Sequence, residues 1–362
     1  MLSIGIVGLP NVGKSTLFNV LVKNHQALAA NYPFATIDPN IGIVEVPDQR
    51  LNQLAEVSKS KKITPTAIKF IDIAGLVSGA STGEGLGNKF LSHIRECDAL
   101  ILVVRFFQDE NVVHVAGKID PKEDFETLKT ELILSDISTL DKLVQNNESA
   151  LRKGDKDALK LEKILSDIYS VLTKGKLASM DRFESKEDKD LVASLPLITL
   201  KPMIIAANLS ENDLNKSYDE IVKEYDFENL TIIPFSAKLE EELLDLDEKE
   251  AKEYLNNLKL NDTGLDRLVQ SSYKMLNLIT YFTSGEQETR AWTIDEGTFA
   301  PQAAGKIHKD FERGFIAAEI TAFDNFIEHK GWEGAKRTGT VRTEGKKYII
   351  KDGDVCFFKF NI

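Results

Sequence analysis

The chain is poor in cysteine and has no long apolar run. Its 362 residues include two cysteines, Cys97 and Cys356, with no CxxC pair and no Cys/His spacing of the kind that binds zinc. We therefore expect no disulfide framework or structural zinc, two buried and unreactive thiols, and a reducing, cytoplasmic location. No stretch approaches the roughly 18 uncharged apolar residues that a bilayer-spanning helix needs, so a membrane is not an expected partner.

An excess of positive charge is also absent. The chain carries 45 Lys and Arg against 57 Asp and Glu, a formal net charge of −12. Phosphate neutralisation needs clustered cations, so this balance argues against a broad nucleic-acid-binding surface. We expect no DNA partner, and any contact with RNA must be local. The length exceeds that of a usual single core, which predicts two or three domains.

Five short apolar runs alternate with helical or loop sequence along the first three quarters of the chain. Runs without polar alternation are typical of parallel strands buried on both faces. The helix expected after the first run covers Ser15–Lys23, where Leu17, Val20 and Leu21 recur at helical spacing. The pattern predicts an α/β fold with a doubly wound sheet, formed by residues 1–124 and 197–278. The runs are 2–7, 68–73, 99–107, 203–207 and 230–235.

A helical insertion interrupts this pattern at residues 125–196, which are rich in charge and leucine and poor in glycine and proline. Two sets of apolar residues repeat every three or four positions on either side of a polar turn at Gly154, which predicts an antiparallel coiled coil. Such a hairpin is either a solvated spacer or an arm that binds a partner, and periodicity does not distinguish them. The sets are Ile133, Ile137, Leu140 and Val144, then Leu161, Leu165, Ile168 and Leu172.

The last part of the chain, residues 279–362, differs in composition. We expect a helix ending near Ile279 and then a separate, small α+β domain with a helix at Pro301–Phe311. Its expected strands are 289–294, 317–323, 347–350 and 355–360.

The sequence GLPNVGKS at residues 8–15 matches the P-loop pattern and lies between an expected strand and an expected helix. Its glycines, Gly8 and Gly13, permit a backbone whose N–H groups point at phosphate oxygens, and the helix dipole favours the same anion. Lys14 is expected to bridge the β- and γ-phosphates, as a catalytic group, and Ser15 to bind Mg²⁺. The nucleotide-binding residues predicted here are Asn11, Val12, Gly13, Lys14, Ser15 and Thr16.

A second phosphate motif follows at the end of the run 68–73. Asp72 and Gly75 form a DxxG motif, in which the aspartate holds Mg²⁺ through water and the glycine N–H faces the γ-phosphate. Thr36, in the preceding loop, is the candidate switch threonine that completes the Mg²⁺ coordination. Gly79, Gly83, Gly85 and Gly87 follow closely and predict a mobile switch segment.

The base-reading loop departs from that of GTPases, which recognise guanine with an NKxD motif. Here the residues are Asn208, Leu209, Ser210 and Glu211, so the short carboxylate that pairs with guanine is replaced. Asn208 can still bond adenine through N6 and N7, which favours ATP. Ser236 and Ala237, in FSAK after the next strand, match the loop that backs the base.

The motifs GLPNVGKSTLFN, NYPFATIDPN, DIAGLVSGAS, GEGLGN, NLSE and FSAK follow one another in this order. In this the sequence resembles, over essentially its whole length, the YchF family of Obg-related ATPases of the translation-factor class. The resemblance implies Mg²⁺-dependent hydrolysis of ATP in preference to GTP and binding to the ribosome, chiefly its large subunit. It also implies that the C-terminal domain is a ubiquitin-like TGS module.

The residue that orients the attacking water is not settled by the sequence. Leu76 stands where Ras-like enzymes carry a glutamine. The family resemblance suggests His114 as a replacement, and His93 is the alternative, although a single histidine is more often structural. Asn11 suggests a bound K⁺ that supplies the charge of an arginine finger, or else it only favours a turn.

One segment of the C-terminal domain is locally basic. Between Glu333 and Lys351 six cations face two acids, whereas residues 279–362 as a whole carry 12 Lys and Arg against 13 Asp and Glu. Such a ribbon could follow ribosomal RNA phosphates, or it could be an ordinary solvated hairpin. The candidate RNA-binding residues are Lys336, Arg337, Arg342, Lys346 and Lys347.

Three functions are compatible with these motifs. The first is an ATPase whose nucleotide state controls its binding to the ribosome, as a regulator of translation or of a stress response. The second is a ribosome- or RNA-binding adaptor that is indifferent to nucleotide and hydrolyses it slowly. A P-loop phosphotransferase is the third, and the DxxG and SAK motifs disfavour it because they belong to switch proteins.

Overall fold

The structure is a computed structural model that describes residues 2–23, 40–73, 86–108, 119–214, 225 and 227–361. The chain divides into two compact units, and each is described by itself. The first unit comprises Met1–Ile43 and Lys69–Leu268, and the second comprises Val44–Ile68 and Val269–Ile362.

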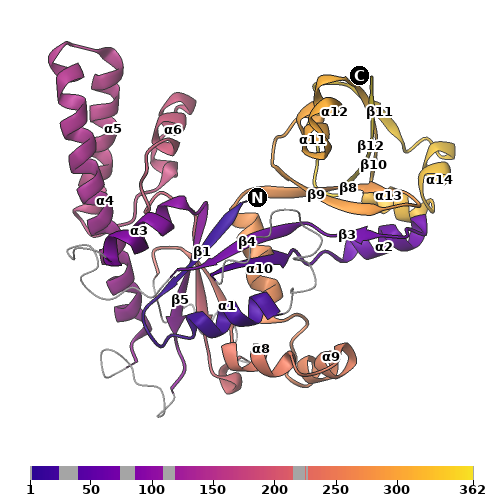
Figure 1. Cartoon of the computed structure of the whole chain (residues 1–362), viewed down its shortest axis with the longest axis horizontal. Helices are drawn as coiled ribbons and strands as arrows, with labels where there is room; N and C mark the ends of the chain where they lie inside the picture. Colours follow the sequence, from indigo (N-terminus) through magenta and orange to yellow (C-terminus); the bar gives the residue numbers. More distant parts are fainter. Residues whose placement is uncertain are drawn as a thin grey trace. The chain divides into compact units, whose positions relative to one another are not determined.

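A six-stranded sheet with the order β2-β4-β1-β5-β6-β7 carries the first unit (Figure 1). All neighbouring pairs from β4 to β7 are parallel, and β1, β5 and β6 are buried along their whole length. The α/β fold predicted from the apolar runs is confirmed. The strands are β1 (Ser3–Gly8), β2 (Ile41–Glu45), β4 (Ala67–Asp72), β5 (Ala99–Arg105), β6 (Met203–Asn208) and β7 (Thr231–Phe235).

Helices α1 and α8 begin shortly after strands β1 and β7 end. Because parallel strands end at one edge of a sheet, the carboxyl ends of β1, β4, β5, β6 and β7 lie together there, and this edge is where α/β folds bind ligands. The helices are α1 (Lys14–Lys23), α3 (Leu86–Glu96), α8 (Ala237–Leu243), α9 (Glu248–Asn257) and α10 (Gly264–Met275).

The insertion forms a helical hairpin, seen as the long pair α4 and α5 in Figure 1. Asp120 caps α4, because its carboxylate accepts a hydrogen bond of 3.1 Å from the backbone N–H of Glu123. Gly154 adopts a φ of +73° in the turn between the two helices. All eight predicted apolar positions lie in one hydrophobic cluster between them. The helices of the insertion are α4 (Pro121–Arg152), α5 (Lys156–Leu172), the 3-10 helix η2 (Met180–Arg182) and α6 (Lys186–Ala193).

The second unit contains a mixed sheet with the order β11-β10-β12-β8-β9-β3. Helices cover both of its faces, with α11 over one cluster of buried residues and α2 and α13 over another. The strands are β3 (Ile63–Thr64), β8 (Leu278–Ser284), β9 (Thr289–Asp295), β10 (Phe315–Ala322), β11 (Arg342–Glu344) and β12 (Asp354–Phe360). The helices are α2 (Gln49–Ser58), α11 (Ala300–Ile307), α12 (Lys309–Arg313), α13 (Phe323–Glu328) and α14 (Trp332–Arg337).

Three sequence predictions for this unit are wrong. The helix expected to end near Ile279 ends at Met275, and strand β8 takes the next positions. The strand expected at 347–350 is a turn followed by an isolated bridge from Ile349 to Phe299. The helix expected at 301–311 is broken at His308, whose extended backbone and Nδ1 acceptor cap a second helix, α12.

Residues 44–68 also belong to the second unit, although the sequence division placed them with the nucleotide-binding domain. The reason is packing: Leu51 and Leu54 of α2 are buried with Phe282 and Val355, and β3 pairs with β9. An amphipathic helix indicates that one face is buried, but not which sheet it covers.

Both cysteines are buried, as predicted, with exposed fractions of 1% for Cys97 and 2% for Cys356. Burial raises the pKa of Cys97 to about 11 and that of Cys356 well above its ordinary value. Neither thiol forms a thiolate readily at neutral pH. In the described part of the chain, no helix combines the length and the hydrophobicity needed to cross a membrane.

Glu240, in α8, is a buried carboxyl group that holds the start of α10. Its Oε1 accepts a hydrogen bond of 2.6 Å from the backbone N–H of Gly264, and the residue is 3% exposed. Burial raises the pKa of Glu240 to about 7, an effect that the nearby Asp266 increases and the N–H groups of Gly264 and Leu265 partly offset. The folded state therefore favours the protonated form.

We predict that Glu240 makes the first unit less stable as the pH rises from 4.5 to 7. The folded state binds this proton more tightly than the unfolded state, so the contribution is complete below pH 4.5 and lost by about pH 7, by on the order of 3 kcal/mol. Glu240→Gln removes the titration and retains an acceptor for Gly264. Urea unfolding of both proteins across this range should show the wild type losing stability relative to the variant. Glu241→Gln, an exposed change on the same helix, is the control, and parallel curves for wild type and Glu240→Gln would contradict the prediction.

Candidate nucleotide site

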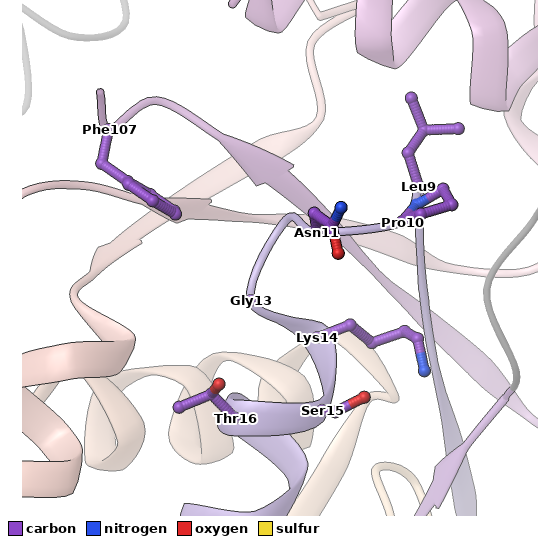
Figure 2. A pocket seen from close by; sticks show the side chains of 8 residues that line it. All are labelled: Leu9, Pro10, Asn11, Gly13, Lys14, Ser15, Thr16 and Phe107. Carbon is purple, nitrogen blue, oxygen red and sulfur yellow. The ribbon is translucent and has the colours of Figure 1, made fainter. Parts of the chain in front are cut away.

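Residues 9–13 form the turn that joins β1 to α1, with Lys14 as the first residue of the helix (Figure 2). Asn11 has a φ of 64° and Gly13 a φ of 93°. A Cβ atom on Gly13 would lie 2.2 Å from Nδ2 of Asn208, so this position requires glycine for its backbone conformation and for space. The left-handed conformation of Asn11 is one that asparagine tolerates well, which supports its interpretation as a turn-forming residue.

A cavity of about 570 Å³ lies over this turn. Figure 2 shows Phe107 on one side of the loop and Leu9 and Pro10 on the other. Five of the six binding residues predicted from the P-loop line the cavity, whereas Val12 is 1% exposed and packs into the core. The five predicted from the base-reading and SAK loops are not among its lining residues: Asn208, Leu209, Glu211, Ser236 and Ala237. The lining residues are Leu9, Pro10, Asn11, Gly13, Lys14, Ser15, Thr16 and Phe107.

Lys14 and Asp72 form an ion pair that joins the P-loop to the end of β4. Lys14 is 8% exposed and lines the cavity, so its ammonium is largely withdrawn from bulk solvent. Ser15 and Asp72 provide a hydroxyl and a carboxylate oxygen, the donor types that Mg²⁺ prefers. The donors present thus fit the predicted ion. Thr36 and Gly75, the other predicted phosphate and metal contacts, lie outside the described residues.

Asn208 connects three segments of the site. Its Nδ2 donates a hydrogen bond of 2.9 Å to the backbone carbonyl of Val12, and its Oδ1 accepts one of 3.0 Å from the backbone N–H of Ala237. The side chain is 2% exposed. Both ends of the amide are therefore used inside the protein, and the observed role of Asn208 is to hold the P-loop against the SAK loop. Its contact with adenine stays a prediction.

The two substituted positions of the base-reading loop have different surroundings. Leu209 is buried in an apolar cluster with Leu214 and Leu239. Glu211, half-buried at the start of the 3-10 helix η3 (Glu211–Asp213), accepts a hydrogen bond of 2.7 Å from the hydroxyl of Tyr254 in α9. This bond is the main reason that the pKa of Tyr254 is raised. Ser236 caps α8, with a bond of 3.4 Å from the N–H of Leu239 to its hydroxyl.

Sequence reasoning missed Arg105, Phe107 and Tyr254. Arg105 ends β5 and is fully buried, with hydrogen bonds of 3.1 Å to the carbonyl of Phe107 and 3.5 Å to that of Asn11. Its guanidinium lies 4.4 Å from the centre of the Phe107 ring. Arg105 thus ties the tip of the P-loop to the opposite wall of the cavity. A charge at the end of a wholly apolar strand was the available signal, whereas nothing near Tyr254 in the sequence indicated its contact.

His114 and His93 are the predicted candidates for orienting the attacking water. His114 lies outside the described residues. His93 is exposed in the last turn of α3. Neither role is tested, and both stay predictions.

The predicted basic ribbon does not lie on one face. Lys336 forms a salt bridge of 2.8 Å with Glu319. Arg342 donates a hydrogen bond of 3.0 Å to the hydroxyl of Tyr348 and pairs with Glu344 at 3.5 Å. Arg342 lies opposite Ile320, a core residue of β10, and therefore points to the core side of the sheet. Arg337, Lys346 and Lys347 are exposed.

Comparison with known proteins decides the family. A ribosome-binding ATPase YchF from Bacillus subtilis is 49% identical over 366 aligned residues, which cover 100% of both chains. The chain belongs to the YchF family. The YchF of Escherichia coli O157:H7, also named a ribosome-binding ATPase, is 48% identical over 99% of both chains. A solved structure described as a YchF GTPase, from Schizosaccharomyces pombe, has 39% identity and a TM-score of 0.87, over 99% of this chain and 97% of the other.

Two family models cover separate parts of this YchF chain. One described as a 50S ribosome-binding GTPase matches residues 3–139, and one described as YchF-GTPase_C, a protein of unknown function, matches residues 278–361. A GTP-binding protein from Pyrococcus horikoshii, 20% identical with a TM-score of 0.62 over 99% of this chain and 100% of the other, shares the fold. The description of the second model does not mention a TGS module, so the assignment of the C-terminal domain as a TGS module stays a prediction.

We predict that Gly13→Ala weakens nucleotide binding at least about tenfold, because the added methyl group displaces Asn208 and opens the contact between the P-loop and Ala237. Gly154→Ala is the matched control: Gly154 also has a left-handed φ, but no atom of the described residues lies within 4 Å of its Cβ position. The control carries the backbone strain alone, about 1 kcal/mol. Titration calorimetry with nucleotide, together with thermal melting, separates the two effects, and equal nucleotide affinities in both variants would contradict the prediction.

Proposed function

We propose that the chain is an Mg²⁺-dependent ATPase that binds the ribosome, hydrolyses ATP in preference to GTP, and regulates translation through its nucleotide state. Its curated relatives in B. subtilis and E. coli are named ribosome-binding ATPases, and this name supports both parts of the proposal. The S. pombe relative, by contrast, is named a GTPase. We therefore infer the preference between adenine and guanine from the contacts of the base-reading loop.

The contact between Glu211 and Tyr254 carries the preference for ATP. Guanine recognition in GTPases needs a free, short carboxylate that accepts from N1–H and the 2-amino group. Here the residue is longer by one methylene group, and Oε1 already accepts from the Tyr254 hydroxyl. Binding guanine would require this bond to be exchanged or shared. Adenine makes no such demand, because its Watson–Crick edge carries no N1–H.

The chain's own residues supply most of the phosphate chemistry. The N–H groups of the P-loop and the Lys14 ammonium would hold the β- and γ-phosphates as charge develops on them. Ser15, Asp72 and Thr36 would hold Mg²⁺, which neutralises charge on these phosphates when bound. In this proposal Gly75 contributes its N–H to the γ-phosphate and His114 or His93 orients the water. K⁺ near Asn11 is a further proposed cofactor, and equal rates in K⁺ and Na⁺ would contradict it.

The parts outside the nucleotide site are proposed to contact the ribosome. We assign the hairpin of α4 and α5 as a coiled-coil arm and residues 279–362 as a TGS-like domain that touches ribosomal RNA, chiefly of the large subunit. The exposed Arg337, Lys346 and Lys347 support a local RNA contact. Periodic packing supports the arm, since its apolar positions form one cluster.

We predict that the wild type binds ATP at least about tenfold more tightly than GTP, and that Tyr254→Phe narrows this ratio about fivefold. Loss of the hydroxyl frees the Glu211 carboxylate for guanine. Calorimetric titration of both nucleotides with Mg²⁺ measures the ratio, and Tyr169→Phe, an exposed tyrosine on α5, is the control. Leu209→Lys is a poor test, because it places an ammonium in an apolar cluster. Tighter binding of GTP by the wild type would refute the ATP preference, and an unchanged ratio in Tyr254→Phe would refute its proposed cause.

We predict that ribosome binding depends on nucleotide. In sedimentation with purified large subunits, a non-hydrolysable ATP analogue and ADP should give dissociation constants that differ at least about fivefold, as for an ordinary coupling between two sites. Gly13→Ala should abolish this difference and retain nucleotide-free binding. Equal binding in every nucleotide state would identify the alternative, an adaptor indifferent to nucleotide. Absence of binding in all states would exclude the ribosome as a partner.

A further inference from the structure

Among the residues that the structure describes, helices cover only part of one face of the second sheet. The cluster formed by α2 and α13 covers Phe282 of β8, Ala291 of β9 and Val355 of β12. The strands at the other side of the sheet, β10 and β11, contribute no buried residue to that cluster. We call the uncovered part the Phe357 face. It consists of Ala317, Glu319, Lys336, Thr343, Phe357 and Lys359.

The strand register places these residues on one side. Glu319 lies opposite Phe357 on β12 and opposite Thr343 on β11. Ala317 lies opposite Lys359. Side chains alternate across a strand, so these residues share a face, whereas their neighbours Ile320 and Phe358 lie in the core with α11. Lys336 reaches the same face from α14.

Phe357 is an exposed aromatic ring held in a defined position. It is 56% exposed. Its ring centre lies 6.5 Å from that of Trp332 at an angle of 71°, and Trp332 is itself fixed by a hydrogen bond of 3.0 Å to the carbonyl of Ser284. The chain thus keeps a large apolar ring in water, on a sheet face, with its orientation set by a packed neighbour.

The charges around the ring are positive on balance. Lys336 and Lys359 both pair with the single carboxylate of Glu319, and their side chains remain 54% and 45% exposed. Glu319 is 13% exposed, and these two bonds lower its pKa. Two cations over one anion leave one net positive charge beside the ring, in a chain whose net charge is −12.

We propose that the Phe357 face binds single-stranded RNA, with a base stacked on Phe357 and the adjoining phosphates held by Lys336 and Lys359. An exposed ring on a sheet with flanking cations has the chemistry of sequence-tolerant single-strand recognition. Bases in a duplex are already stacked on one another and cannot use the ring. A protein partner is less suitable, because the residue opposite Phe357 and both neighbouring lysines are charged. The inference deepens the proposed ribosome function by naming an RNA site.

The test uses the full-length chain, a short fluorescein-labelled oligoadenylate and an RNA hairpin with a fully paired stem, measured by fluorescence anisotropy. Phe357→Ala should weaken oligoadenylate binding about tenfold, and Phe357→Trp should retain it. Ile316→Ala, which truncates a β10 side chain that is 59% exposed, is the matched control and should change nothing. Lys359→Gln should lower the slope of log affinity against log salt by about one. ATP hydrolysis should be the same in all of these variants, which shows that each is folded.

Three outcomes would overturn the RNA site. The first is equal affinity of the wild type for the hairpin and the oligoadenylate, and the second is equal oligoadenylate affinity of Phe357→Ala and Ile316→Ala. The third is that Phe357→Ala loses ribosome binding without any change in oligoadenylate binding. The last result would show that the face contacts protein. Oligoadenylate binding is measured without ribosomes, so it tests this site separately. Phe357-dependent binding in a chain that never sediments with ribosomes would support the RNA site and refute only the proposed ribosome function.

Discussion

The nucleotide site depends on the side-chain amide of Asn208. This one group bonds the backbone of Val12 in the P-loop and that of Ala237 at the start of α8, and it comes from the last residue of β6. Gly13 must lack a side chain because Asn208 occupies the space where its Cβ would be. The loops after three strands are therefore positioned by a buried amide whose two ends both have partners, and such fully bonded polar groups give a site a single geometry.

The positions that follow Asn208 are held by other contacts. The N–H of Leu209 bonds the carbonyl of Phe235, so its backbone is fixed while its side chain joins an apolar cluster. The carboxylate of Glu211 bonds a tyrosine from α9 instead of lying free for a base. In the proposed function these two positions set the base preference, while the P-loop supplies the phosphate contacts.

In the second unit, one part of the sheet is packed under helices and another part is exposed. The helices α11 and α2 with α13 cover opposite faces of one sheet, which buries most of its apolar residues. The face of β10 and the end of β12 stay open and carry an aromatic ring among paired charges. The same charges suit a polyanion.

The sequence by itself determined the parallel sheet, the P-loop and the packing positions of the helical hairpin. Each of these follows from a local sequence pattern: apolar runs, glycines at fixed spacing, or a repeat of three and four residues. It also placed Lys14, Ser15 and the neighbouring loop residues on the cavity that the structure shows. These features were predictable because each residue's role depends on its near neighbours in the chain.

Only the tertiary structure decided which sheet α2 covers, what Glu211 contacts, and that Arg105 ties Asn11 to Phe107. It also separated the basic ribbon, since Arg342 points to the core side and Lys336 to the open face. The contacts of Glu211 with Tyr254 and of Arg105 with Asn11 join residues 43 and 94 positions apart, and the energy of a contact depends on distance in space. No local pattern records such pairs, because the chain must fold before the partners meet.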